Sequence, residues 1–105
     1  MGSIWVLPSR RTVGSAVKPI RLSAHARDQA ASRGTDVHEI AIVINSADWT
    51  PADRGRFEAR LAFIFNDEWN GRHYTSKVVR PVFVDQEGEI VVITVYVYFS
   101  QDEVA

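Results

Sequence analysis

Residues 89–99, the last regular segment of the chain, read as a β-strand whose two faces differ. Successive residues of a β-strand point to opposite faces of the sheet. One face of this segment is wholly apolar and consists of Val91, Ile93, Val95, Val97 and Phe99. The other face gains hydroxyl groups toward its C-terminal end and consists of Ile90, Val92, Thr94, Tyr96 and Tyr98. The pattern predicts a strand that covers a core with one face and offers a Thr–Tyr–Tyr face to solvent or a ligand.

Two helices are expected before the strands. Ser23 can N-cap a first helix over residues 24–33, and Gly34 can end it. Asp36 and Glu39 have the spacing of a capping box at the start of a second helix, which ends near Asn45-Ser46. Its apolar residues recur at the i, i+3, i+4, i+7 spacing of an amphipathic helix. A polar ridge on the first helix consists of His25, Gln29 and Ser32 or Arg33.

Strand patterns fill much of the remaining chain. Strands are expected over residues 19–22, 56–65, 73–84 and 89–99. The Asn70-Gly71 pair indicates a tight turn between the second and third of these strands. Pro81 indicates that the third strand lies at an edge of the sheet or carries a bulge. Residues 85–88 are expected to form the loop into the closing strand.

These elements predict an α+β fold in which two N-terminal helices pack on one face of a three- to four-stranded antiparallel sheet. The 105 residues, 46% of them apolar, suit a single domain over residues 18–100. Residues 1–17 are expected to be a flexible N-terminal arm, and residues 101–105 an acidic C-terminal tail. No apolar run is long enough for a membrane helix. Cysteine is absent, which suits a reducing compartment, so a cytoplasmic protein with no membrane contact is expected.

The net charge of −1 argues against a strong nonspecific nucleic-acid binder. The charges are nevertheless unevenly distributed. Residues 1–33 carry six basic side chains and one acidic one, whereas residues 84–105 carry five acidic side chains and no basic one. Such a distribution can bind an anion locally, or it can be ordinary solvated surface charge. Three scattered histidines lack the spacing of metal ligands, so neither a metal nor another cofactor is expected.

Candidate chemistry lies on the predicted non-core sides of neighbouring strands. A general base and a general acid, with cations that stabilise a phosphorane, are the groups that metal-independent cleavage of RNA through its 2′-hydroxyl needs. Tyrosine side chains can also stack on unpaired bases. In a ribonuclease hypothesis the catalytic residues are His25, Glu58, Arg60 and Tyr96, with Glu58 as base and His25 as acid. The substrate-binding residues are then Lys77, Arg80, Tyr74, Thr94 and Tyr98.

Structural explanations account for the same residues. Arg56, Glu58 and Arg60 can form cross-strand ion pairs on a solvated sheet, which contribute little individually. Tyrosine and threonine are strong strand formers, and His25 can hydrogen-bond a neighbouring loop. Two other hypotheses therefore stay open. The first is a noncatalytic module that binds protein or nucleic acid with this face, and the second is a homodimer formed through the tyrosine-rich face or an edge strand.

A series of short motifs runs in order through residues 18–99. They are Arg21-Leu22-Ser23-x-His25-Ala26 leading to Arg33-Gly34-Thr35, then Arg54-Gly55-Arg56-x-Glu58-x-Arg60, Glu68-Trp69-Asn70-Gly71, Lys77-x-Val79-Arg80-Pro81 and Val92-x-Thr94-Val95-Tyr96. Together they resemble the bacterial domain-of-unknown-function 4258 family. That family is similar in turn to the RelE and barnase-like group of small α+β ribonuclease toxins.

The resemblance implies two helices packed on an antiparallel sheet, RNA as a substrate, and an antitoxin or another protein as a partner. It places seven candidate residues within family motifs: His25, Glu58, Arg60, Lys77, Arg80, Thr94 and Tyr96. It assigns them no catalytic roles, because the family itself has no established activity. RelE-type toxins are usually strongly basic and this chain is not. The difference favours a smaller substrate, a protein partner or loss of activity.

Overall fold

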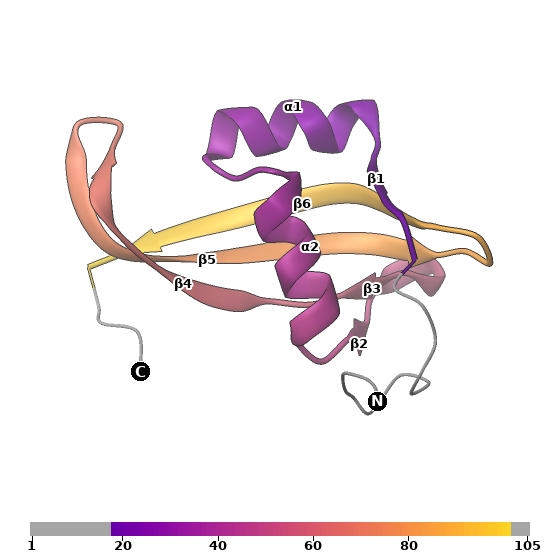
Figure 1. Ribbon diagram of the computed structural model, residues 1–105. Coiled ribbons are helices and arrows are strands. Elements are labelled where there is room, and N and C mark those ends of the chain that lie inside the picture. The colour runs from indigo at the N-terminus through magenta and orange to yellow at the C-terminus, as the bar shows by residue number, and fades with distance from the viewer. Residues whose placement is uncertain (1–17, 102–105) are drawn as a thin grey trace.

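A computed structural model describes residues 18–101, which form an α+β fold of two helices and a six-stranded sheet (Figure 1). The elements are β1 (Ile20–Leu22), α1 (Ala24–Arg33), α2 (Val37–Ser46), β2 (Thr50–Pro51), the 3₁₀ turn η1 (Asp53–Gly55), β3 (Phe57–Glu58), β4 (Leu61–Trp69), β5 (Arg72–Asp85) and β6 (Ile90–Ser100). The predicted arm over residues 1–17 and nearly all of the predicted acidic tail lie outside the described residues. None of the helices in residues 18–101 is long and apolar enough to cross a membrane.

The sheet is mixed, with strand order β1-β6-β5-β3-β2, and β4 also pairs with β5. β1 runs parallel to β6, and the other pairs are antiparallel. The α+β class is confirmed, whereas the predicted three to four antiparallel strands are wrong. The strand expected over residues 19–22 is β1, and its pairing with β6 is parallel. The strand expected over residues 56–65 is divided between β3 and β4, and β2 was not expected. β2 and β3 are two residues long and leave almost no alternating pattern to read.

β5 is the central strand, although it contains proline. β3 and β4 pair with it in one continuous register, with Glu58 opposite Val82 and Leu61 opposite Val79. Pro81 lies opposite Ala59, between the two paired segments, where its missing N–H interrupts the ladder. The Ala59 N–H still donates to the Pro81 carbonyl at 3.3 Å. The predicted edge position is therefore wrong, and a shift in the β5–β6 register follows directly after Val82.

That shift is a β-bulge in β6, and it corrects the two faces predicted for the strand. Val82 pairs with Thr94 and Phe83 pairs with Val92, so Ile93 is an extra residue without a partner on β5. The alternation inverts at this residue. Val92 consequently shares the helix-covered face with Val95, while Val91 lies on the opposite side of the sheet.

The helices and the sheet enclose one apolar core. α2 crosses β5 and α1 lies beside β6 (Figure 1). The largest fully buried side chains are Phe83, Ile40, Ile44, Val43, Val79, Val92, Val95 and Pro81. Trp49 closes one margin of this core, with its ring 4.9 Å from that of Phe83 and its indole N–H donating to the Ile44 carbonyl at 2.8 Å.

The predicted helix ends are confirmed by their caps. The Ser23 hydroxyl accepts from the Ala26 N–H at 3.0 Å, and the Asp36 carboxylate accepts from the Glu39 N–H at 3.0 Å. Gly34 ends α1 in the left-handed conformation, with φ of 88°, and its N–H donates to the Ala30 carbonyl. The αL cap turns the chain directly from α1 into α2.

Gly34→Ala should destabilise the fold by about 2–4 kcal/mol, which combines the strain of a left-handed alanine with overpacking. A Cβ at this position would lie 3.1 Å from the Phe99 ring and 3.2 Å from the Trp69 ring. Gly71→Ala is the matched control, because Gly71 also has positive φ and a Cβ there meets nothing within 4 Å. Urea unfolding of both variants measures the difference, and equal losses of stability would contradict the proposed steric contact.

Two ion pairs attach the β1 segment to the β5–β6 hairpin. Lys18 Nζ lies 2.6 Å from the Asp85 carboxylate, and Arg21 Nη2 lies 2.9 Å from that of Glu89. Arg21 lowers the pKa of Glu89, first through the hydrogen bond. Glu89 therefore stabilises the fold above its unfolded pKa, and this contribution is lost as the pH falls through its lowered folded pKa. Both groups are exposed, so the contribution is small.

Candidate functional site

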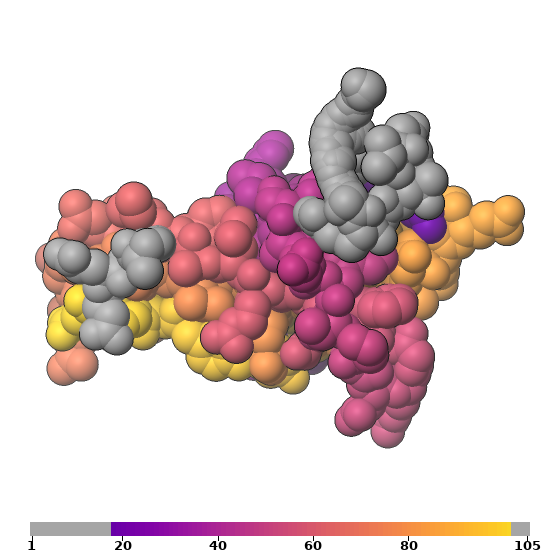
Figure 2. Space-filling view, turned by 90° about the horizontal axis from the view of Figure 1, so that it is seen from below, coloured from indigo at the N-terminus to yellow at the C-terminus, as the bar shows by residue number. Residues whose placement is uncertain are grey.

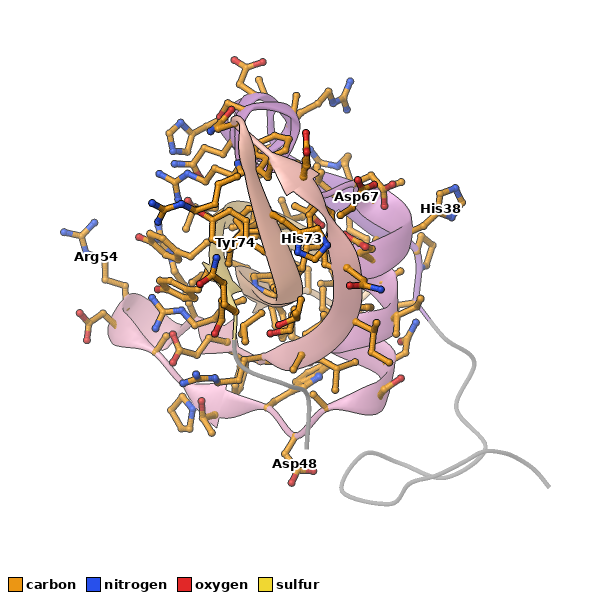
Figure 3. All side chains as sticks on the ribbon, turned by 90° about the vertical axis from the view of Figure 1, so that its left-hand side faces the viewer. His38, Asp48, Arg54, Asp67, His73 and Tyr74 are labelled. Carbon is orange, nitrogen blue, oxygen red and sulfur yellow. The ribbon has the colours of Figure 1, made fainter. Side chains whose placement is uncertain are left out.

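The sheet face opposite α2, called the open face below, carries most of the candidate residues. The register places Glu58, Val82 and Thr94 side by side across three strands. In the next row Arg80 lies opposite Tyr96, and the shared register of β3 and β4 places Arg60 opposite Arg80 on its other side. Figure 3 looks along the strands and shows Arg54 of η1 projecting on the side of the molecule away from His38 of α2.

Two arginines and two tyrosines form a stack at the β6 side of the open face. The Arg80 guanidinium carbon lies 4.7 Å from the centre of the Tyr96 ring and 5.7 Å from that of Tyr98. The Arg33 guanidinium carbon, which comes from α1, lies 5.2 Å from the Tyr96 ring. These distances are typical of cation–π contacts. We call Arg33, Tyr96, Arg80 and Tyr98 the Arg–Tyr stack.

The Arg80 side chain has unused hydrogen-bonding capacity. Its Nε atom is buried and has no hydrogen-bond partner among the residues that the structure describes. A buried guanidinium nitrogen without an acceptor is unfavourable, because the group loses hydration without replacing it. An acceptor from a bound ligand or a water molecule would complete this group.

Side chains of α1 satisfy the backbone of β6 at the edge that β5 leaves free. The Arg33 Nη1 donates to the Val95 carbonyl at 3.0 Å, and the Gln29 side-chain oxygen accepts from the Val95 N–H at 3.2 Å. The same Gln29 oxygen accepts from the Thr94 hydroxyl. Thr94 therefore uses its hydroxyl to hold α1 against β6, which is a structural role. The Arg33 guanidinium is fixed in position for its contact with Tyr96.

A groove of about 260 Å³ opens beside the Arg–Tyr stack. It is lined by Ser32, Arg33, Trp69, Tyr96, Val97, Tyr98 and Phe99. Trp69, at the end of β4, lies nearly parallel to Phe99, with ring centres 5.4 Å apart and planes 12° apart. The groove thus lies between the C-terminal end of α1 and the β4–β5 hairpin (Figure 1). Its walls are aromatic, and Arg33 supplies a charge.

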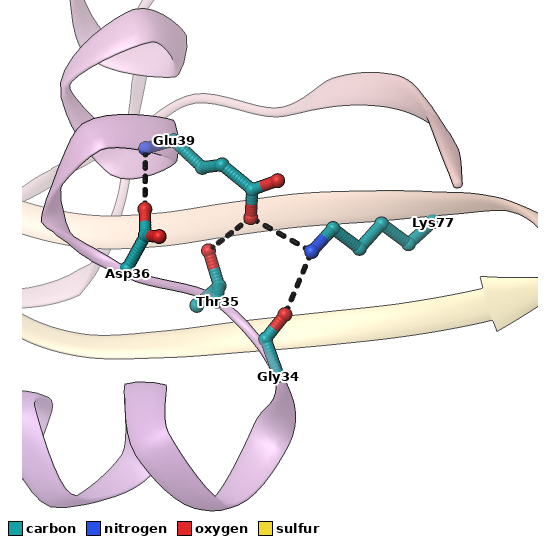
Figure 4. A network of polar contacts seen from close by, with 5 residues as sticks. All are labelled: Gly34, Thr35, Asp36, Glu39 and Lys77. Carbon is teal, nitrogen blue, oxygen red and sulfur yellow. Dashed lines mark hydrogen bonds and ion pairs between the residues drawn. The ribbon is translucent and has the colours of Figure 1, made fainter. Parts of the chain in front are cut away.

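Lys77 does not belong to the open face, although the sequence grouped it with the ligand-binding residues. Its side chain is 7% exposed and lies under the α1–α2 junction, as Figure 4 shows. The ammonium group lies 2.8 Å from the Glu39 carboxylate and donates to the Gly34 carbonyl at 2.7 Å. Thr35 also donates to the Glu39 carboxylate, at 2.8 Å. This network fixes the start of α2 on the sheet, so Lys77 has a structural role and is not part of the open face.

Tyr74 packs within the β4–β5 hairpin. Its ring centre lies 5.3 Å from that of Phe99, and Phe65 contacts Phe99 from another side at 5.2 Å. Figure 3 shows Asp67, His73 and Tyr74 together in this curled hairpin. Tyr74 therefore supports the aromatic cluster behind the groove, and it is not among the groove-lining residues.

The structure does not bring His25 next to Glu58. Glu58 is half-buried on β3, and its row crosses β5 to reach Thr94 on β6. Glu58 and Thr94 lie on strands separated by β5. Neighbouring strands are about 5 Å apart, so the backbones of Glu58 and Thr94 are about 10 Å apart. His25 is exposed on α1, beyond β6 and one turn before Gln29. The two side chains therefore lie on opposite sides of β6, outside hydrogen-bond reach of each other.

Several residues of the site were not assigned to it from the sequence. Gln29 and Arg33 appeared only as members of a polar ridge. Phe99 was predicted to lie on the apolar face of its strand, and Trp69 appeared only within a family motif. The spacing of the ridge was a usable signal. Residues at i, i+4 and i+8 lie on one face of a helix, so their side chains can contact the same neighbouring element. Nothing in the sequence indicated that this face would lie along the free edge of β6.

Within residues 18–101 no group of three or more histidine, aspartate and glutamate side chains is arranged to hold a metal ion. Comparisons with known proteins find no matching family model, no matching curated protein and no matching solved structure.

Proposed function

We propose that the protein binds single-stranded RNA through the open face, with the Arg–Tyr stack as the recognition element. The observation that carries this proposal is the alternation of guanidinium groups and tyrosine rings at 4.7–5.7 Å. Unpaired bases stack on aromatic side chains and on guanidinium planes, while arginine also contacts phosphates. The groove beside the stack adds Trp69 as a further aromatic surface.

The open face is locally basic, which suits RNA, although the whole chain carries a slight negative charge. Arg33, Arg60 and Arg80 lie on or beside this face, with Glu58 as the acidic residue of the same rows. The net charge of the chain is −1, which gives no long-range attraction for a large polyanion. A short single strand that engages a few phosphates suits this distribution.

Fluorescence anisotropy with a labelled single-stranded RNA of about ten nucleotides tests the proposal, because OB-fold domains, which are of similar size, cover roughly 4–16 nucleotides of a single strand. We expect saturable binding, with weaker binding to an RNA hairpin of the same length. The logarithm of the binding constant should fall linearly with the logarithm of the salt concentration. Each phosphate contact contributes about −0.7 to that slope, and we expect about two or three contacts. Absence of binding at low salt, or stronger binding to the hairpin, would overturn the proposal.

A second candidate function is metal-independent endoribonuclease activity of the toxin type. The observation that favours it is the position of Glu58 in the row next to Arg60 and Arg80. In this mechanism the Glu58 carboxylate takes the proton of a 2′-hydroxyl, and that oxygen attacks the phosphorus. The 5′-oxygen leaves as it gains a proton, from His25 or from water, while Arg60 and Arg80 stabilise the phosphorane. The separation of His25 from Glu58 requires a substrate that spans β6.

Glu58→Gln should lower the rate of RNA cleavage by about 100- to 10,000-fold, which is the usual contribution of a general base. Binding of the same RNA should persist, because glutamine keeps the size of the side chain. The assay is carried out in chelator, with Asp53→Asn of the exposed η1 turn as the matched control. Undiminished cleavage by Glu58→Gln would remove this mechanism while leaving the binding proposal intact.

We further propose that the chain is a distant relative of the domain-of-unknown-function 4258 family and of the RelE and barnase-like toxins. The ordered motifs from Arg21 to Tyr96 and the α+β fold support this relationship. A protein partner of antitoxin type would follow from it, and the lack of cysteine suits a cytoplasmic location. Co-purification of the tagged chain with the product of a neighbouring gene tests the partner.

A further inference from the structure

The outer edge of β4 is free. β4 pairs with β5 along one side, and no strand in residues 18–101 pairs with its other side. Backbone groups of an antiparallel strand alternate in direction, and the Ala59 N–H donates toward β5. The shared register then directs the N–H and C=O groups of Ala62 and Ile64 outward. These unpaired groups form a template for another strand.

The side chains of this edge offer no protection against such pairing. Residues 61–65 read Leu-Ala-Phe-Ile-Phe, without a charge, a proline or a glycine. Ile64 is 80% exposed, the highest value among the exposed large apolar side chains. Natural edge strands usually carry charged residues, prolines or bulges that prevent association. The β4 segment reaches the molecular surface in Figure 2, in salmon, and residues 61–64 carry none of these features. The register of β4 against β5 shifts between Ile64 and Asp67, so a bulge ends the regular edge at Phe65 and Asn66.

We propose that β4 pairs with β4 of a second copy of this chain, antiparallel, about a two-fold axis at Phe63. The segment is self-complementary in this register. Phe63 lies opposite its own counterpart, Leu61 opposite Phe65, and Ala62 opposite Ile64. Each of these pairs is apolar, and the outward backbone groups of Ala62 and Ile64 meet as hydrogen-bonded pairs. A two-fold axis makes the contact isologous, so that assembly stops at the dimer.

Charge complementarity selects the second copy and the antiparallel direction. Arg60 precedes the apolar segment, and Asp67 and Glu68 follow it. With the two-fold axis at Phe63, residue 60 of one copy meets residue 66 of the other, and the bulge between Ile64 and Asp67 sets two residues of β4 against one. Arg60 of one copy therefore lies next to Asp67 of the other at both ends of the contact. A parallel arrangement would instead place arginine beside arginine and aspartate beside aspartate, which is unfavourable. An unrelated partner would need the same uncharged centre with the same opposite charges at its ends.

Such a dimer forms one continuous sheet across both copies. A two-fold axis perpendicular to the sheet keeps both open faces on the same side, with the helices of both copies on the other. The interface consists of a short strand pair, so its dissociation constant should be about micromolar or weaker, as for small interfaces. This inference does not depend on RNA binding.

Sedimentation velocity of the full chain, from about 1 to about 500 µM, tests the proposal in the range of weak interfaces. We expect a concentration-dependent shift from monomer to dimer. Ile64→Lys should weaken dimerisation at least about tenfold, because it places an ammonium group in the apolar contact. Ile42→Lys is the matched control, since Ile42 is also an exposed isoleucine but lies on α2, away from β4. A chain that stays monomeric throughout, or a dimer that both variants weaken equally, would overturn the proposal.

Two further variants keep the test independent of the folding of Ile64→Lys. Ala62→Pro removes an outward N–H that β5 does not use, so the fold retains its own ladder while the dimer loses two hydrogen bonds. Asp67→Lys should weaken the dimer through repulsion from Arg60, and the double variant Arg60→Glu with Asp67→Lys should restore it. Circular dichroism verifies folding in each case. A dimer unchanged by Ala62→Pro, or a double variant weaker than Asp67→Lys, would contradict pairing through β4.

Discussion

Arg80→Ala should weaken the binding of single-stranded RNA by about 10- to 100-fold, the effect of losing a stacked base or its equivalent. Arg80 contacts both tyrosines of the Arg–Tyr stack, at 4.7 and 5.7 Å, so its removal frees both rings. The same change removes one phosphate contact and should reduce the magnitude of the salt slope by about 0.7. Anisotropy titrations at several salt concentrations measure both effects.

Controls separate this role from general charge and from stability. Arg54→Ala removes an equal charge from the exposed η1 turn, outside the Arg–Tyr stack, and should change affinity by less than about threefold. A surface charge that stacks on no base acts only through the screened field. Arg80→Lys keeps the positive charge but lacks the planar guanidinium group. Its salt slope should therefore equal that of the unchanged chain, while its affinity should stay close to that of Arg80→Ala. Tyr96→Phe should bind nearly normally, whereas Tyr96→Leu should not. Equal losses for Arg80→Ala and Arg54→Ala would contradict a specific stack.

Glu39→Gln should destabilise the fold by about 2–4 kcal/mol, because it leaves a buried ammonium group without its counter-charge. Lys77 is 7% exposed, and its remaining hydrogen-bond acceptor among the contacts described above is the Gly34 carbonyl, at 2.7 Å. Glu39 is 26% exposed, so the expected loss lies below that of a fully buried pair. Urea denaturation, with the transition followed by the tryptophan fluorescence, measures the change.

The double variant Glu39→Gln with Lys77→Met distinguishes the uncompensated charge from the loss of packing. Methionine retains most of the length of the lysine side chain without its charge, so the double variant should recover most of the lost stability. Glu87→Gln, in the exposed β5–β6 loop, is the control and should have little effect. A double variant less stable than Glu39→Gln alone would show that the lysine charge itself stabilises the fold.

Local signals predicted the helices and the main hairpins well, because their causes are local. Ser23, Gly34 and Asp36 cap α1 and α2 where expected, since a cap acts through backbone groups a few residues away. Asn70 and Gly71 both have positive φ, as a two-residue hairpin turn with this pair requires. The Glu39 side chain is different. Its position in a capping box predicted a contact within the helix, but a lysine 38 residues away along the chain binds it instead.

Features that depend on distant parts of the chain were not predictable from the pattern. The parallel pairing of β1 with β6 joins segments about seventy residues apart, and three residues of β1 carry no sign of direction. Pro81 predicted an edge strand or a bulge, because proline lacks an N–H. The edge position is wrong, and a register shift does follow next to Pro81, although its extra residue lies on β6. Pro81 is tolerated in a central strand because the interruption between β3 and β4 lies directly opposite.

The candidate site was predicted in part for the same reason. Glu58, Arg60, Arg80, Tyr96 and Tyr98 share one face, as period-2 alternation required. Lys77 was grouped with them, although it differs from Arg80 by an odd number of strand positions and so points to the other face. Arg33 joins the site because α1 lies along β6. The local sequence pattern does not predict how α1 packs against that strand.

The extra residue at Ile93 gives β6 a property that a regular strand would not have. Residues 90–92 and residues 94–99 alternate in opposite phases, because Ile93 has no partner on β5. Deleting Ile93 would join Val92 directly to Thr94 in regular alternation, so Val92 and Val95 would still meet the helices and Tyr96 would stay on the open face. A deletion or an insertion further along β6 would instead turn the side chains that follow it to the other face. In relatives of this chain, one residue fewer at position 93 is therefore compatible with the same two faces, whereas a change of length after Thr94 is not.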